Sequence, residues 1–215
     1  MLYDCSQLTE RERGIAAAIE AVQRGDLIVM PTDTVYGIGA DAFKSWSVNA
    51  LNNAKGRTTP VPVLVGSRQT LDGLVFGLPQ PARDLVDAFW PGALTIVVEH
   101  APSLQWELGS DDGTVAVRMP LHPVALEVLR ETGPMAVSSA NKHQQPPALT
   151  AAEAREQLGY SVSLYLEAGR CQDRVASTII SLVGGENRVL RAGAIPFEKL
   201  REVVPDLVDA QYPVG

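Results

Sequence analysis

Polar and cationic side chains recur where apolar runs of this chain end. The stretch "PTDTVYGIG" follows the apolar run "DLIVM" and presents two threonines, an aspartate and a tyrosine before two glycines. Pro31 cannot donate a strand hydrogen bond, and the glycines allow tight backbone geometry, so the stretch is predicted to be a loop. Open α/β sheets bind ligands in loops beyond strand ends. We therefore expect Thr32, Thr34 and Tyr36 to face a ligand, and a turn that merely carries polar side chains is the alternative.

Three further positions supply positive charge. Lys55 and Arg57 flank a glycine in "AKGR" and could converge on a phosphate or carboxylate; the alternative is a solvated helix end whose cations offset the helix dipole. Arg118 closes the apolar strand pattern "TVAVRM", where a charged residue needs a partner or a ligand. A structural salt bridge is the alternative for Arg118.

Hydroxyl and amide side chains follow other strand patterns. "VSSAN" places Ser139 and Asn141 at a strand end, and Ser177 and Arg191 repeat this arrangement later in the chain. Such groups can donate to and accept from a nucleotide or an amino acid. Together with the cations, they suit electrostatic and positional catalysis on an anionic substrate better than covalent catalysis.

Several established chemistries lack their sequence patterns. The chain contains no G-x-x-x-x-G-K-[ST] phosphate loop, no G-x-S-x-G nucleophile elbow and no H-E-x-x-H metal pair. The two cysteines, Cys5 and Cys171, lie far apart and without metal-ligand spacing. We therefore predict no metal-ligating residues and no disulfide framework.

The candidate residues must be positioned by strands and helices, which alternate early in the chain, whereas the last predicted strands follow one another directly. Apolar runs predict strands near 26–30, 61–66, 94–99, 114–119, 135–140, 163–168, 177–183 and 188–193. Helical spacing, glycine stops and a Thr150–Glu153 capping box predict helices near 11–25, 45–54, 81–90, 122–133 and 150–159. Strands that alternate with helices and later follow one another directly predict an open α/β fold with a mixed sheet.

Composition and net charge indicate the number of domains, the cellular location and the partners to expect. The 215 residues are 46% apolar and carry a formal net charge of −7, which disfavours long-range attraction of the whole molecule to nucleic acid. No linker-like stretch divides the chain, so we expect one domain over residues 1–205 and a C-terminal tail over 206–215. The chain has no span-length apolar run and no signal-like start. We expect a cytoplasmic protein without a membrane partner.

Seven motifs in this order resemble the YrdC/Sua5 family, the L-threonylcarbamoyladenylate synthases. The motifs are "PTDTVYGIGADA", "KGR", "FWPGALTIVV", "TVAVRMPLHP", "SSAN", "STII" and "LRAGAI". The likeness covers about residues 10 to 200 and is closest to the single-domain members. It implies a YrdC-like fold, in which helices flank a twisted open mixed sheet that curves around a concave basic groove.

The resemblance also implies an activity. Family members join L-threonine, bicarbonate and ATP, which is accompanied by Mg²⁺, into threonylcarbamoyl-AMP and pyrophosphate. The product serves the N6-threonylcarbamoyladenosine modification at position 37 of tRNAs that read codons beginning with A, through a downstream tRNA threonylcarbamoyl-transfer complex. Some members also bind tRNA or double-stranded RNA.

Residue roles follow from the matched motifs. By resemblance, the residues that contact threonine are Thr32, Thr34, Tyr36, Arg118, Val137 and Ser177. Those that contact ATP are Lys55, Arg57, Thr114, Ser139, Asn141 and Arg191, with Lys55 and Arg57 as the catalytic pair.

Two stretches depart from the family pattern on the ATP side. "TTPVPVLVG" after Arg57 is a residue or two short, and "SANKHQ" replaces the small turn that usually follows "SAN", with Pro147 where a serine often contacts ATP. The altered turn keeps a second hypothesis open, namely a tRNA or double-stranded RNA binding module of the same fold without synthase activity. A third is a related carbamoyl-transfer domain that acts on another amine.

Overall fold

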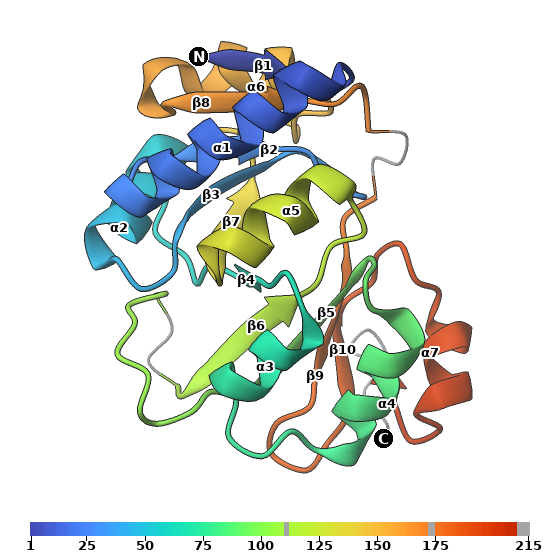
Figure 1. Ribbon diagram of the computed structural model, residues 1–215. Coiled ribbons are helices and arrows are strands. Elements are labelled where there is room, and N and C mark those ends of the chain that lie inside the picture. The colour runs from blue at the N-terminus through green and yellow to red at the C-terminus, as the bar shows by residue number, and fades with distance from the viewer. Residues whose placement is uncertain (110–111, 172–174, 210–215) are drawn as a thin grey trace.

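The computed structural model describes residues 1–109, 112–171 and 175–209 (Figure 1). Its helices are α1 (Leu8–Arg24), α2 (Ser45–Lys55), α3 (Arg68–Leu74), α4 (Gln80–Phe89), α5 (Pro123–Thr132), α6 (Ala151–Leu158) and α7 (Phe197–Val203), with a short 3-10 turn at Gly159–Ser161. Its strands are β1 (Leu2–Asp4), β2 (Ile28–Met30), β3 (Gly37–Asp41), β4 (Val63–Leu64), β5 (Leu94–Glu99), β6 (Thr114–Arg118), β7 (Met135–Ser139), β8 (Leu164–Glu167), β9 (Thr178–Ser181), β10 (Arg188–Arg191) and β11 (Val208–Asp209).

All of these strands join one open sheet in the order β1-β8-β2-β3-β7-β4-β6-β5-β9-β10-β11. Parallel pairs such as β2 with β8 and β5 with β9 alternate with antiparallel pairs such as β3 with β7 and β5 with β6. The mixed α/β sheet predicted from the sequence is therefore confirmed. The eight predicted strands and five predicted helices all form, whereas the sequence patterns missed β1, β3, β11, α3 and α7.

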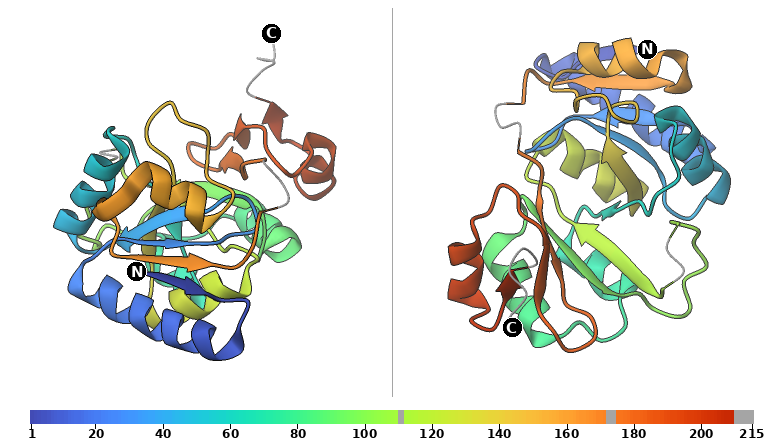
Figure 2. Two further views of the ribbon diagram at one scale, coloured as in Figure 1. Left: turned by 90° about the horizontal axis from the view of Figure 1, so that it is seen from above. Right: turned by 180° about the vertical axis from the view of Figure 1, so that it is seen from behind.

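The two halves of the sheet are covered differently. Around β2, β3 and β8, helices α1 and α5 pack on one face and α2 and α6 on the other (Figure 2). In the other half, α4 and α7 cover the face that carries Ile96, Val117 and Ile180. On the opposite face, Val97 and Ala116 remain partly exposed. This second half therefore keeps one face of β6, β5 and β9 open, beside the strand ends that carry the candidate residues.

Strand β3 explains two glycines that the sequence suggested were loop residues. A Cβ atom on Gly37 would lie 2.7 Å from Val137 Cγ1, and one on Gly39 would lie 2.8 Å from Met135 Cε. Both separations are shorter than real Cβ contacts, so a side chain at either position would require Val137, Met135 or the strand itself to shift. The glycines thus allow close packing inside the sheet and bring the loop 31–36 beside the end of β7.

Val208 and Asp209, which the sequence analysis placed in a C-terminal tail over 206–215, instead pair with β10 as β11. The rest of the expected tail, 210–215, lies outside the described residues. In the described part of the chain, no helix combines the length and the apolar character that crossing a membrane requires.

Candidate active site

A cavity of about 370 Å³ opens where the loop 31–36 meets the ends of β6, β7 and β10 and the start of β9. We call it the arginine cavity. The predicted residues in its lining are Thr32, Thr34, Tyr36, Arg57, Arg118, Val137, Ser139, Ser177 and Arg191. Residues from distant parts of the sequence therefore share one site. Lys55, Asn141 and Thr114 are the predicted residues outside the lining.

The two threonines of the loop 31–36 shape it as well as line the cavity. Thr32 Oγ1 donates to the Val35 carbonyl at 2.6 Å and accepts from the Thr34 amide at 3.2 Å. Thr34 Oγ1 lies 3.1 Å from Thr32 Oγ1 and accepts from Arg118 at 3.0 Å. Thr32 therefore fixes the turn, and Thr34 connects it to the arginine.

Arg118 is held by three acceptors at the end of β6. Its Nε donates to the Gly92 carbonyl at 2.9 Å, one terminal nitrogen donates to Thr34, and the other donates to Asp33 Oδ1 at 2.6 Å. Arg118 is only 6% exposed, and its burial lowers its pKa while the Asp33 carboxylate opposes that shift. A guanidinium has five N–H groups, so one N–H remains on each terminal nitrogen for a ligand. The structural salt bridge and the ligand role are therefore compatible.

Arg57 and Arg191 lack carboxylate partners among the described residues. Arg57 follows Gly56, which ends α2 with a φ of 70°, and its exposed side chain lines the cavity. Arg191 donates twice to the Ser177 carbonyl, at 2.7 and 3.1 Å, and once to Ser177 Oγ at 3.0 Å. Arg191 is also close enough to Arg118 to lower its pKa. No aspartate or glutamate lines this cavity, so its described wall favours an anion.

Lys55 lies behind the cavity wall instead of at its surface. It is 2% exposed, and its ammonium donates to the Ser139 carbonyl and to the Asn141 carbonyl at 2.9 Å. The solvated helix end considered as an alternative for Lys55 is therefore wrong. Burial, aided by the positive charge of Arg57, lowers the pKa of Lys55 to about 8. In this structure Lys55 holds the end of β7, and its direct contact to ATP stays a prediction.

Asn141 is also engaged within its own loop. Its side-chain Nδ2 donates to the carbonyls of Lys142 at 2.9 Å and Gln145 at 2.7 Å, and its Oδ1 lies 3.4 Å from Lys55 Nζ. These bonds organise the altered "SANKHQ" turn, in which Gln144 adopts a positive φ of 66°. Pro147 at the end of this loop lines the arginine cavity.

Thr114 lies at the opposite end of β6 from Arg118, where its hydroxyl donates to Asp112 at 2.7 Å. Alternate residues of a strand point to one face, so Thr114, Ala116 and Arg118 share the open face of the sheet. A ligand in the cavity would have to extend along this face to reach Thr114.

Two residues that the sequence analysis did not select belong to this site. Asp33 accepts from Arg118 and from the Leu121 amide at 2.9 Å. Thr95 lines the cavity from β5, is 2% exposed, and lies 2.8 Å from Ser177 Oγ. The signal for Thr95 was present in the sequence, as a lone hydroxyl inside the apolar run "LTIVV".

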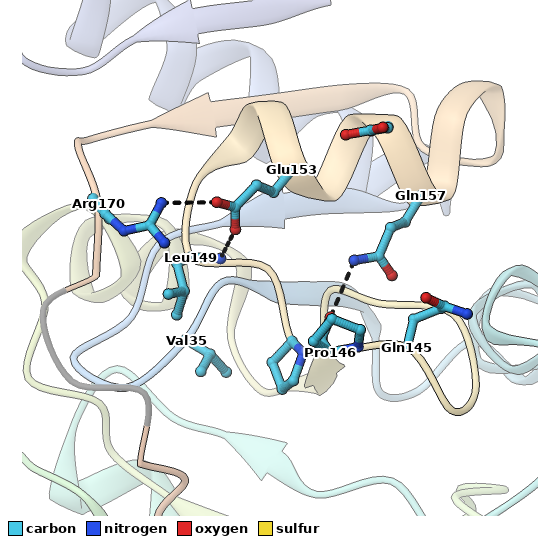
Figure 3. A pocket seen from close by; sticks show the side chains of 9 residues that line it. Val35, Gln145, Pro146, Leu149, Glu153, Gln157 and Arg170 are labelled. Atoms are coloured by element: carbon cyan, nitrogen blue, oxygen red, sulfur yellow. Dashed lines mark hydrogen bonds and ion pairs between the residues drawn. The ribbon is translucent and has the colours of Figure 1, made fainter.

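A second cavity, of about 460 Å³, adjoins the first and shares Val35 and Pro147 with it. We call it the neighbouring cavity. Its Arg170 and Glu153 face each other at 2.8 Å, Glu153 also accepts from the Leu149 amide, and Gln157 donates to the Pro146 carbonyl at 3.1 Å (Figure 3). It gathers none of the predicted site residues.

The described residues contain no group of three or more histidine, cysteine, aspartate or glutamate side chains placed to hold a metal ion. The described lining of the arginine cavity has three cations and no carboxylate, and such a lining is chemically unsuited to a resident divalent cation.

Comparison with known proteins shows the family to which the chain belongs. The sequence profile of the Sua5/YciO/YrdC family, described as telomere recombination, matches residues 20–193. The chain belongs to this family. A Mycobacterium tuberculosis protein, named provisionally as a threonylcarbamoyl-AMP synthase, is 56% identical over 204 residues, which are 94% of each chain. The Bacillus subtilis threonylcarbamoyl-AMP synthase is 33% identical over 92% of this chain and 58% of its own length.

The crystal structure of Pyrococcus abyssi Sua5 with L-threonine matches the fold with a TM-score of 0.89 and 30% identity. The match covers 97% of this chain and 62% of that one, so this chain spans less than two thirds of the longer Sua5 form.

Proposed function

We propose that this protein is an L-threonylcarbamoyladenylate synthase, which forms threonylcarbamoyl-AMP, pyrophosphate and water from L-threonine, bicarbonate and ATP. One observation supports this most strongly. Arg57, Arg118 and Arg191 line one cavity that has no carboxylate in its described wall, and two of the three have no carboxylate partner among the residues that the structure describes. The names of the relatives favour a synthase over an RNA-binding module of the same fold.

The threonine half of the site would lie between the loop 31–36 and β9. The two N–H groups that Arg118 retains can bind a carboxylate as a fork. Thr34 and Ser177 offer hydroxyls beside it, and Val137 offers an apolar wall for the threonine methyl group. We assign Thr32 and Tyr36 to the shape of this half, because the Thr32 hydroxyl closes the turn onto the Val35 carbonyl and the Tyr36 hydroxyl donates to Glu167, which does not line the cavity.

The ATP half would lie between the end of β7 and β10. Arg57 and Arg191 supply positive charge for the phosphates, and Ser139 supplies a hydroxyl. The open face of β6 would carry the remainder of the nucleotide toward Thr114. Pro147 lines the cavity where a serine would offer a hydrogen bond. Lys55 and Asn141 would position Ser139 without lining the cavity themselves.

Magnesium would enter as part of the MgATP substrate. Because no carboxylate lies in the part of the cavity lining that the structure describes, we propose that phosphate oxygens and water, instead of side chains, complete the coordination of the magnesium ion.

The chemistry explains why the cations must converge. The threonine amine and bicarbonate first form an N-carboxylate, with loss of water, and this carbamate readily loses carbon dioxide. One of its oxygens then attacks the α-phosphorus while the bond to pyrophosphate breaks. Two anions must therefore be held in contact with water excluded, which fixed cations and a partly enclosed cavity provide.

The mixed anhydride would pass to a downstream complex that transfers the threonylcarbamoyl group to adenosine 37 of tRNA. ATP and tRNA are both cytoplasmic, and we propose that location for the protein. Direct tRNA contact would require a local basic surface, because the net charge of −7 opposes long-range attraction.

Pyrophosphate release tests the proposal. We expect purified protein with MgATP and bicarbonate to release pyrophosphate only when L-threonine is added, with threonylcarbamoyl-AMP detectable by mass spectrometry. A folded protein that releases none, or releases it equally with D-threonine or without any amino acid, would contradict the synthase assignment.

A further inference from the structure

A buried tyrosine and a carboxylate meet behind the arginine cavity, and the reaction proposed above uses neither group directly. Tyr36 is 0% exposed, and the single proton of its hydroxyl lies between two acceptors at 2.7 Å, Glu167 Oε1 and the Gly169 carbonyl. The Ala168 amide donates to the same hydroxyl at 3.0 Å. Burial and the Glu167 carboxylate raise the pKa of Tyr36, so this hydroxyl remains a donor.

Glu167 uses its other bonds to hold the next element. Its Oε1 also accepts from the Gly169 amide, and its Oε2 accepts from the amide of Ala151, the first residue of α6, both at 2.8 Å. A carboxylate at this position also interacts favourably with the helix dipole. The carboxylate therefore links the end of β8, the start of α6 and the Tyr36 side chain.

The main chain of Tyr36 reaches the opposite wall of the cavity. Its amide donates to the Ala148 carbonyl at 3.0 Å, and its carbonyl accepts from the Ala140 amide at 2.8 Å. Ala140 and Ala148 are the two stems of the loop 141–147, which follows Ser139 and ends at Pro147. Tyr36 thus spans from the loop 31–36, on the threonine half, to the loop that borders the ATP half.

We propose that Glu167, acting through the Tyr36 hydroxyl, is a positioning residue that sets the relative placement of the threonine and ATP halves of the cavity. This inference rests on the proposed function for the identity of the two substrates. Because the carbamate has to meet the α-phosphorus within contact distance, a small displacement of one wall relative to the other lowers turnover more than it lowers binding of either substrate. A buried network that only stabilises the fold would not have this selectivity.

The chain offers a matched control in Tyr165. It is 2% exposed, and its hydroxyl donates to the Gly159 carbonyl at 2.7 Å, but it does not line the arginine cavity. Tyr165→Phe and Tyr36→Phe therefore each remove one tyrosine hydroxyl that donates to a main-chain carbonyl at 2.7 Å, and only Tyr36→Phe also removes a bond to a carboxylate. The experiment compares these variants with Glu167→Gln and with the double variant Glu167→Gln/Tyr36→Phe. Hydrogen–deuterium exchange of 31–37 and 139–149, thermal unfolding, and steady-state pyrophosphate release are measured for each.

We expect Glu167→Gln and Tyr36→Phe each to lower kcat roughly tenfold, with smaller changes in the KM values for threonine and ATP, and to speed exchange in both segments. The double variant should be no worse than the worse single variant, because both changes interrupt one connection. Tyr165→Phe should also lower the unfolding temperature, while kcat and exchange in these segments stay at wild-type values.

Two results would overturn the inference. One is that Glu167→Gln and Tyr36→Phe behave like Tyr165→Phe in kcat and exchange; the other is that the effects of the two single changes multiply in the double variant. A wild-type protein without threonine-dependent pyrophosphate release would instead reject the proposed function, and the exchange measurements would then still decide whether Glu167 holds the two loops.

Discussion

The two adjoining cavities differ less in size than in how their charges are paired. The neighbouring cavity holds about 460 Å³ and the arginine cavity about 370 Å³, and in the neighbouring cavity Arg170 is paired with Glu153. In the arginine cavity, only Arg118 has a carboxylate partner among the described residues, and Arg57 and Arg191 have none. Cations without carboxylate partners among the described residues are therefore a better guide to an anionic substrate than volume is.

The comparison also separates two kinds of arginine within one site. Arg118 and Asp33 form a buried pair, with side chains 8% and 16% exposed, so Arg118 has both a structural and a ligand role. Arg191 is exposed and bonds only to Ser177 among the described residues. Loss of function and loss of stability should therefore coincide for the first arginine and separate for the second.

The largest effect is expected for Arg118→Ala. This change removes the fork for the threonine carboxylate and leaves Asp33 partly buried without its counter-ion, which costs on the order of 3 kcal/mol of folding free energy. We expect kcat/KM for threonine to fall by about a hundredfold or more, together with a lower unfolding temperature. Arg191→Ala is the matched comparison. It should lower kcat/KM for ATP to a similar extent and leave the unfolding temperature nearly unchanged.

Kinetics and thermal unfolding of both variants test this separation. If both variants lower the unfolding temperature equally, the ion pair with Asp33 does not make Arg118 more important for stability than Arg191. Full threonine use by a folded Arg118→Ala protein would remove Arg118 from the substrate site.

The sequence identified these residues as candidates better than it placed them. Arg118, Ser139 and Arg191 all end strands, which singled each of them out. However, β4 pairs parallel with β6 and antiparallel with β7, so the ends of β6 and β7 lie at opposite edges of the sheet, and only the tertiary fold brings their residues to one cavity. Strand β3 was missed because its two glycines resemble a turn, whereas they in fact allow close packing on Val137 and Met135.

What the sequence could not supply is the partner of each polar atom. Lys55 has the residue type of a phosphate ligand, but its ammonium reaches main-chain carbonyls at the end of β7, which no pattern of side chains encodes. The Tyr36 hydroxyl likewise meets Glu167, 131 residues further along the chain, through the pairing of β2 with β8. Such long-range contacts are fixed by tertiary packing, and local sequence signals do not report them.

An intermediate effect is expected from the charge on Lys55. Its pKa is about 8 in the folded protein and 10.5 when unperturbed, so between these values the unfolded chain binds more protons than the folded one. Folding stability therefore rises with pH across this window and is lost as pH falls through about 8, by on the order of 1–3 kcal/mol. We expect chemical denaturation at pH 8 and pH 10.5 to show this rise in wild type relative to Lys55→Met, which lacks the titrating group. A stability difference between the two proteins that does not change with pH would contradict the burial of a charged Lys55.

The smallest effect is expected in the neighbouring cavity. Arg170→Ala breaks the ion pair with Glu153, whose two side chains are 52% and 40% exposed, and such a pair contributes about 0–1 kcal/mol because water screens both charges. Kinetic constants for threonine and ATP should stay within about twofold of wild type, and the unfolding temperature should change by no more than about 3 °C. The same assays applied to Arg191→Ala provide the contrast, since both changes remove one exposed arginine from a cavity wall. If Arg170→Ala instead lowers kcat/KM as strongly as Arg191→Ala does, a paired cation is as important for substrate as an unpaired one. The difference in charge pairing would then no longer identify which of the two cavities holds the substrates.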